Sequence, residues 1–142
     1  MNSMIGVIAF ATAIIVSLSA ILVGGRPRPV GIVILLGWTA TLLVSRQTEV
    51  HRVQEGVLIV DSLALVALAA LYIARPSWWR LIIAGAQVNA VLSHVVIGLG
   101  TGMVGYAYGS AVWLLGILQL APLTVAAFQT WRSPRGLTRR PG

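Results

Sequence analysis

The chain has 142 residues, of which 58% are hydrophobic and only 9% are charged, whereas about 25% are charged in an ordinary soluble domain. A soluble core cannot absorb that much apolar sequence, so the composition indicates an all-α integral membrane protein. The net charge of +7 comes from ten arginines and three acidic residues. These arginines stand singly or in pairs between apolar runs, which argues against a nucleic-acid-binding face. The absence of cysteine excludes disulfides and thiolate metal sites.

Five apolar segments approach the length of about 20 residues that a helix needs to cross a bilayer. Short Gly-, Pro- or Arg-containing connections separate them, so the sequence predicts a compact bundle of about five transmembrane helices in one domain, residues 1–131. The second segment is short, and the third is the clearest. The predicted spans are 4–23, 30–44, 56–74, 81–99 and 108–128.

The distribution of arginine predicts the orientation of these spans. With five spans, one side of the membrane receives two arginines and the other side receives the remaining eight. Because positive charge is enriched in cytoplasmic loops, we expect a periplasmic amino terminus and a cytoplasmic carboxyl terminus. The first segment has no basic residue before it, so we interpret it as a retained span and not as a cleaved signal peptide.

The last eleven residues, 132–142, form a basic tail behind Trp131. Pro134, Gly136 and Pro141 disfavour a stable helix there. Arginines near an anionic leaflet are attracted to it, so we expect the tail to contact anionic lipid or an acidic partner through Arg132, Arg135, Arg139 and Arg140.

Two ionisable residues fall inside predicted spans. Asp61 precedes the turn between the third and fourth segments by as many positions as His94 follows it, so the two should lie at one height in an antiparallel hairpin. A polar group left alone in hydrocarbon is costly. We therefore predict a carboxylate–imidazole hydrogen bond, which either locks two helices together or serves as a proton relay or ligand-orienting pair.

The fourth segment is the most polar span. Gln87 lies seven residues before His94 and hence on the same helical face, while Asn89 lies on a neighbouring face. Gln119 of the fifth segment is a possible partner. The candidate polar site therefore comprises Asp61, Gln87, Asn89, His94 and Gln119, none of them at the spacing of a metal cluster.

Small residues suggest two further features. Ala90 and Gly98 flank His94 by one turn on each side, which resembles the histidine environment of antenna polypeptides that ligate bacteriochlorophyll. This likeness implies room for a flat ring. Glycines at four-residue spacing permit close helix packing or a flexible turn; they are Gly98 with Gly102 and Gly105 with Gly109.

Function is less constrained than location. The chain lacks a Gly-x-Ser-x-Gly elbow, a His-Glu-x-x-His motif and a P-loop, so we do not expect an enzyme. Two stretches, 56–61 and 86–94, are similar to those of short multi-span proteins of bacterial inner membranes, a resemblance that implies no activity. Small size and short loops favour a structural or accessory subunit that packs against other membrane subunits or itself. The alternative is a protein that binds a cofactor, proton or lipid around His94.

Overall fold

The computed structural model contains five α-helices, and it describes residues 2–44, 55–98 and 105–133. Four of the helices are long and apolar enough to cross a membrane, whereas the second has 17 residues and is shorter than the others. The helices are α1 Asn2–Val23, α2 Arg28–Val44, α3 Glu55–Ala74, α4 Trp78–Gly98 and α5 Gly105–Arg132.

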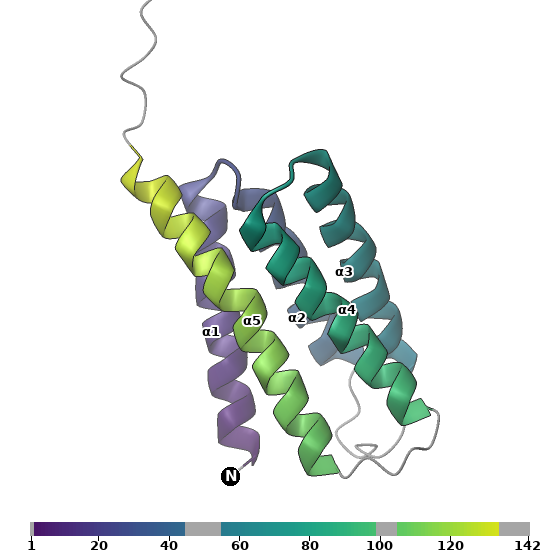
Figure 1. The fold of residues 1–142 in the computed structure, drawn as a ribbon. Helices are drawn as coiled ribbons and strands as arrows, with labels where there is room; N and C mark the ends of the chain where they lie inside the picture. The colour runs from purple at the N-terminus through teal and green to yellow at the C-terminus, as the bar shows by residue number, and fades with distance from the viewer. Residues whose placement is uncertain (1, 45–54, 99–104, 134–142) are drawn as a thin grey trace, which may run out of the picture.

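The five helices pack in a closed ring, each against the next in sequence, with α5 returning to α1 (Figure 1). Consecutive helices run in opposite directions, so the α1–α2 turn, the α3–α4 turn and the carboxyl end of α5 lie at one end of the bundle. We call this the arginine end. Its described arginines are Arg26, Arg28, Arg75, Arg80 and Arg132.

The turns at the arginine end follow from local sequence. Gly24 and Gly25 both adopt positive φ, 76° and 65°, a conformation that glycine reaches without steric cost and that commonly ends helices. After Pro76, the carbonyl of Ser77 accepts the amide of Leu81 at 3.0 Å, so α4 begins at Trp78, three residues before the predicted span. The two turns are therefore tight and bring paired helices together.

The boundaries of α5 differ more from the sequence-based expectation. The helix runs from Gly105 to Arg132 and contains Pro122, whereas the predicted span covers 108–128. The predicted span ends where the apolar residues end. The helix continues beyond that point, because glutamine, threonine and tryptophan are also compatible with a helix. The helix thus includes Arg132, the first residue of the predicted tail, and residues 134–142 lie outside the described part of the chain.

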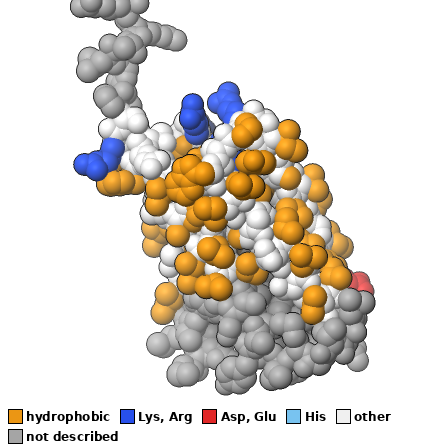
Figure 2. Space-filling view, viewed as in Figure 1, with side chains coloured by type: hydrophobic (Ala, Val, Ile, Leu, Met, Phe, Trp, Pro, Cys, Tyr) orange, Lys and Arg blue, Asp and Glu red, His pale blue; other side chains and the backbone are white. Residues whose placement is uncertain are grey.

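The outer surface of the bundle is predominantly apolar. Figure 2 shows hydrophobic side chains spread over the described part of the visible face below the arginine end. In α3 only 11% of the span is buried inside the protein, although its mean hydropathy is 2.4. An exposed apolar surface of this extent is unusual for a soluble monomer. The length and composition of these helices are compatible with a membrane location.

The apolar core occupies the half of the bundle nearer the arginine end. Ile83 and Leu123 are fully buried, and Trp79 closes the core at the beginning of α4. Most of the remaining core residues lie within about two helical turns of that end, and many are alanines, which allow close helix approach. They are Ala13, Ala20, Val30, Ile34, Leu68, Ala84, Leu120, Ala126 and Ala127.

The closest helix contact joins α1 and α2. A Cβ atom placed on buried Gly31 would lie 2.9 Å from the carbonyl oxygen of Ser17 and 3.0 Å from Cβ of Ala20. Small residues on both helices therefore let the two backbones meet, as is common between membrane helices. Neither glycine pair that the sequence analysis singled out makes this contact.

Candidate functional site: a buried polar network

A hydrogen bond joins the carboxyl group of Asp61 on α3 to the imidazole of His94 on α4. Oδ2 of Asp61 lies 3.0 Å from Nε2 of His94. A carboxylate can only accept, so in that form Nε2 carries the hydrogen. The predicted contact between these two residues is confirmed. The equal distance of both residues from the α3–α4 turn explains their common height.

Gln87 extends this pair into a network. Its Nε2 group donates to the main-chain oxygen of Asp61 at 3.0 Å and to Oδ1 of the same residue at 3.2 Å. Its Oε1 atom accepts from Nε2 of Gln119 on α5. The order of contacts is therefore His94–Asp61–Gln87–Gln119, and it links α3, α4 and α5.

The helical period determines which side chains of α4 enter the network. Gln87 and His94 are seven residues apart, or close to two turns, so both point towards Asp61 from one face. Gln87 is nine positions beyond the first residue of α4, whereas His94 is sixteen beyond it. The network consequently lies on the far side of the apolar core from the arginine end, in the middle and opposite part of the bundle.

The network is largely closed to the surroundings. Gln87, His94 and Gln119 are exposed by only 5%, 6% and 7% of their surfaces, and the Asp61 side chain by 21%. Each of these contacts joins side chains that would be costly to leave unpaired in an apolar medium. A hydrogen bond between membrane helices contributes about 0.6–2 kcal/mol. The arrangement therefore stabilises one relative placement of three helices.

The chemistry available to this network is narrow. Within the described residues, no three histidine, cysteine or acidic side chains are grouped so that they could hold a metal ion. The Asp61–His94 pair could hold a proton, but neither glutamine is an acid or a base. The His94 residue is buried, with 6% of its surface exposed, and its contact with Asp61 joins α3 to α4, as in the first of the two interpretations drawn from the sequence.

Several residues proposed from the sequence lie outside the network. The exposed side chain of Asn89 donates to the carbonyl of Gly85 on its own helix at 2.9 Å, because it points to a different face of α4 from Gln87. Ala90 is a partly buried residue of α4 itself. Gly98 is the last residue of α4, and Gly105 is the first residue of α5, which also contains Gly109. The remaining residues proposed from the sequence lie outside the described part of the chain: Gly102, Arg135, Arg139 and Arg140.

A second polar arrangement, around Arg80, was not predicted from the sequence. Its Nη1 group donates to the carbonyls of Leu71 at 3.0 Å and Arg75 at 2.8 Å, and its Nη2 group to the carbonyl of Arg26 at 2.9 Å. The guanidinium also lies 5.0 Å from the ring of Trp79. We call this the Arg80 clamp. In the sequence it is visible only as a single arginine directly before the predicted span 81–99.

The clamp supplies a donor to the carbonyls of Arg75 and Arg26 in the two turns. It adds a second donor to the carbonyl of Leu71, which already accepts the amide of Arg75 at 3.3 Å. Arg80 is buried, with 5% of its surface exposed, and it joins the α1–α2 turn to the α3–α4 turn. Arginine suits this task because its planar group presents several donors in fixed directions. The sequence does not reveal these acceptors, because they are main-chain atoms of three separate places: the last turn of α3, the α3–α4 turn, and a turn 54 residues earlier.

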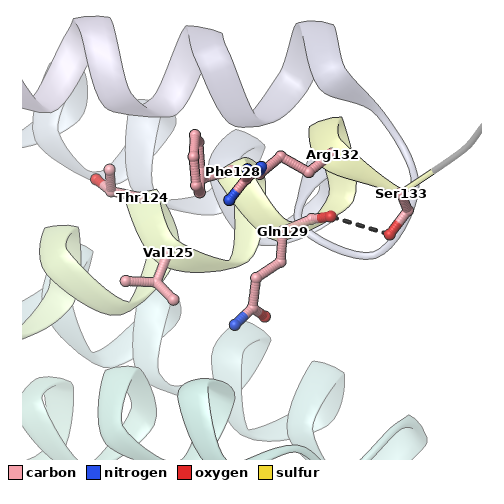
Figure 3. Close-up of a pocket in the computed structure, with 6 residues that line it drawn as sticks. All are labelled: Thr124, Val125, Phe128, Gln129, Arg132 and Ser133. Carbon is pink, nitrogen blue, oxygen red and sulfur yellow. Dashed lines mark hydrogen bonds between the residues drawn. The ribbon is translucent and has the colours of Figure 1, made fainter.

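Two surface hollows accompany these arrangements. An apolar recess of about 380 Å³ lies between α1 and α5, with Trp38 of α2 on its wall; its lining includes Ala9, Thr12, Gly116 and Ile117. A more open groove surrounds the last turns of α5 (Figure 3), where Phe128 and Gln129 point away from each other. In this groove the Arg132 guanidinium lies 5.2 Å from the Phe128 ring. All of the groove's lining comes from one short stretch, 124–133.

Comparison with known proteins adds no functional assignment: no family model, no curated protein and no solved structure matches the chain. The class that the structure itself defines is an all-helical protein whose long apolar helices are compatible with a membrane location. The features of the molecule that bear on its function are therefore the polar network and the apolar exterior.

Proposed function

We propose that this protein is a structural or accessory subunit of a membrane assembly, either with other subunits or with copies of itself. In this proposal all five helices cross a bacterial inner membrane, with the amino terminus periplasmic and the arginine end cytoplasmic. The short helix α2 has 17 residues, which is within the lower limit for a span. The tail arginines would face anionic lipid or a partner.

The observation that carries the proposal is the closure of the polar network. Asp61, Gln87, His94 and Gln119 bond to one another inside the bundle, so they fix the helices in place and are not presented to a substrate. What the described surface offers to other molecules is mainly apolar side chains. A protein with this division of residues is suited to lateral packing within the bilayer.

The alternative function, binding of a cofactor, proton or lipid around His94, requires access to the imidazole. Only 6% of this residue is exposed and its Nε2 atom already pairs with Asp61. A flat macrocycle beside Ala90 and Gly98 would have to displace that contact. The enclosed geometry supports the structural role over this alternative.

Cross-linking in native membranes tests the proposal, and the lack of native cysteine removes any background. Single cysteines at Ile15, Leu63 and Ile117 place a thiol on three exposed faces, which belong to α1, α3 and α5. A subunit should form a specific cross-linked product from one face and little from the others. Absence of any product at native expression, or equal product from all three faces, would contradict a defined subunit contact.

A further inference from the structure

The Arg80 clamp brings two other arginines together at the arginine end. One guanidinium binds the main-chain carbonyls of both Arg26 and Arg75, at 2.9 and 2.8 Å. The side chains of those two residues therefore start from neighbouring points on the surface, although they are far apart in the sequence. Both side chains are exposed, while Arg80 is buried between the two turns.

This convergence concentrates positive charge. Burial first, and then the like charges of Arg75 and Arg26, disfavour the charged guanidinium of Arg80. Repulsion of this kind opposes the placement of three cations around one clamp, so an external anion would relieve it.

No described acidic side chain can supply that anion. Within the residues that the structure describes, the acids are Glu55 and Asp61, and α3 begins at Glu55 but ends at Ala74, next to Arg75. A helix of 20 residues spans about 30 Å, well beyond the screening length of about 8 Å at physiological ionic strength. Among the described residues, therefore, none compensates this charge, which favours an anion supplied by another molecule.

Unused donors lie in the same place. Nε of Arg80 and Oγ of Ser77 are buried and have no hydrogen-bond partner among the described residues. Ser77 directly precedes α4, and its neighbour Trp78 is exposed. Phosphate oxygens accept several hydrogen bonds at once and pair well with arginine. Tryptophan favours the headgroup level of a bilayer, which is the depth at which a phospholipid carries its phosphate.

We propose that Arg26 and Arg75 bind the phosphodiester group of an anionic phospholipid, and that Arg80 is the positioning residue that holds both in place. The site would take the phosphate at the rim of the two turns, with the acyl chains along the apolar exterior. The positive charge of the arginines and the expected position of exposed Trp78 at the headgroup level both favour an anionic phospholipid. The proposal does not depend on the protein being a subunit of an assembly, since the lipid site is formed within one chain.

Native mass spectrometry of the full chain released from mild detergent tests this site. Phosphatidylglycerol and phosphatidylcholine with the same acyl chains are added separately, so only the headgroup differs. We expect retention of one phosphatidylglycerol per chain and much weaker retention of phosphatidylcholine. The double variant R26Q/R75Q should bind phosphatidylglycerol roughly thirtyfold more weakly. It keeps the clamp, because the clamp uses main-chain carbonyls at these positions.

The matched control is R132Q/R135Q, which removes the same charge from the end of α5 and the tail. It should retain phosphatidylglycerol nearly as well as the unaltered protein. Equal loss in both variants would reduce the effect to general charge attraction and overturn the site. No headgroup preference in the unaltered protein would overturn it even if the double variant failed to fold.

Two further arms separate other sources of the anion. Inorganic phosphate at millimolar concentration should not displace the lipid; complete displacement would indicate a free-phosphate site and overturn the lipid assignment. An acidic polypeptide that co-purifies stoichiometrically, is lost in R26Q/R75Q and excludes phosphatidylglycerol would likewise show that a protein partner supplies the charge.

Discussion

Nε2 of His94 lies 3.0 Å from Oδ2 of Asp61, across the seam between α3 and α4. The same carboxyl group accepts from Gln87 through its other oxygen at 3.2 Å. Both oxygens of Asp61 are thus engaged by residues of one neighbouring helix. Asp61 is the acceptor around which the polar network is organised, and its substitution should affect all the helices that the network joins.

A double-mutant cycle measures the Asp61–His94 contact. We expect His94→Leu alone to lower the free energy of unfolding by about 1–3 kcal/mol, since it strands a buried carboxyl oxygen. Asp61→Asn should be tolerated better than Asp61→Leu, because an amide oxygen still accepts. The double change to leucine should recover part of the loss. Unfolding in mixed micelles of increasing denaturing detergent provides the measurement.

The control for that cycle is Asn89→Leu, on the same helix. Its side chain is exposed and, within the described part of the chain, bonds to the carbonyl of Gly85 one turn earlier, so we expect a change below about 0.5 kcal/mol. Strictly additive effects of the two single leucine variants would show that Asp61 and His94 do not interact energetically.

Gln119 provides a second test of the network. Gln119→Leu removes the donor to Oε1 of Gln87, and we expect a loss of about 1–2 kcal/mol, in the upper range for polar contacts between membrane helices. Gln129→Leu is the matched change on the exposed face of the same helix and should leave stability nearly unaltered. The same detergent titration compares them, and equal stability of both variants would count against a structural network.

Gly31 predicts a steric effect at the α1–α2 contact. Gly31→Ala places a methyl group 2.9 Å from the Ser17 carbonyl oxygen, so the two helices must separate, and we expect a cost of about 1–3 kcal/mol. Gly85→Ala adds the same atom where nothing lies within 4 Å, and should be neutral or stabilising by up to about 1 kcal/mol. Thermal unfolding in detergent distinguishes them. A Gly31→Ala variant as stable as Gly85→Ala would refute the close approach.

The Arg80 clamp predicts that charge alone does not suffice at this position. Arg80→Lys keeps the charge but cannot reach three carbonyls in fixed directions, so we expect a loss of about 2–3 kcal/mol from unsatisfied main-chain acceptors. Arg132→Lys, an exposed change on α5, is the control and should have little effect. Proteolysis of the two turns at the arginine end is a second measurement, and unchanged protection in Arg80→Lys would contradict the clamp.

The five-span orientation predicts the location of both chain ends. A reporter fused after Gly142 should read cytoplasmic, and one placed before Met1 should read periplasmic, since the eight arginines of one side remain inside. Moving four of those arginines to the opposite loops should invert or scramble the reading. Both ends on the same side would be incompatible with five spans.

The sequence alone determined the all-helical character and the approximate helix bounds. In an apolar medium the main-chain polar groups of each apolar run must be paired within the run, and a helix does this. It also placed Asp61 and His94 at one height, since helical rise and a short turn leave little freedom along the axis. These are local quantities, and they depend on residue type and spacing within two neighbouring segments.

Only the tertiary structure decided which face of each helix points inward and which distant segments come into contact. Spacing could not show that Gln87 joins Asp61 while Asn89 faces outward, because rotation of each helix about its axis is set by all of its neighbours. The acceptors of Arg80 are main-chain atoms of α3 and of two turns, and main-chain carbonyls have no signature in a sequence. The physical reason is the same in both cases: contacts between separate helices depend on how the whole ring closes.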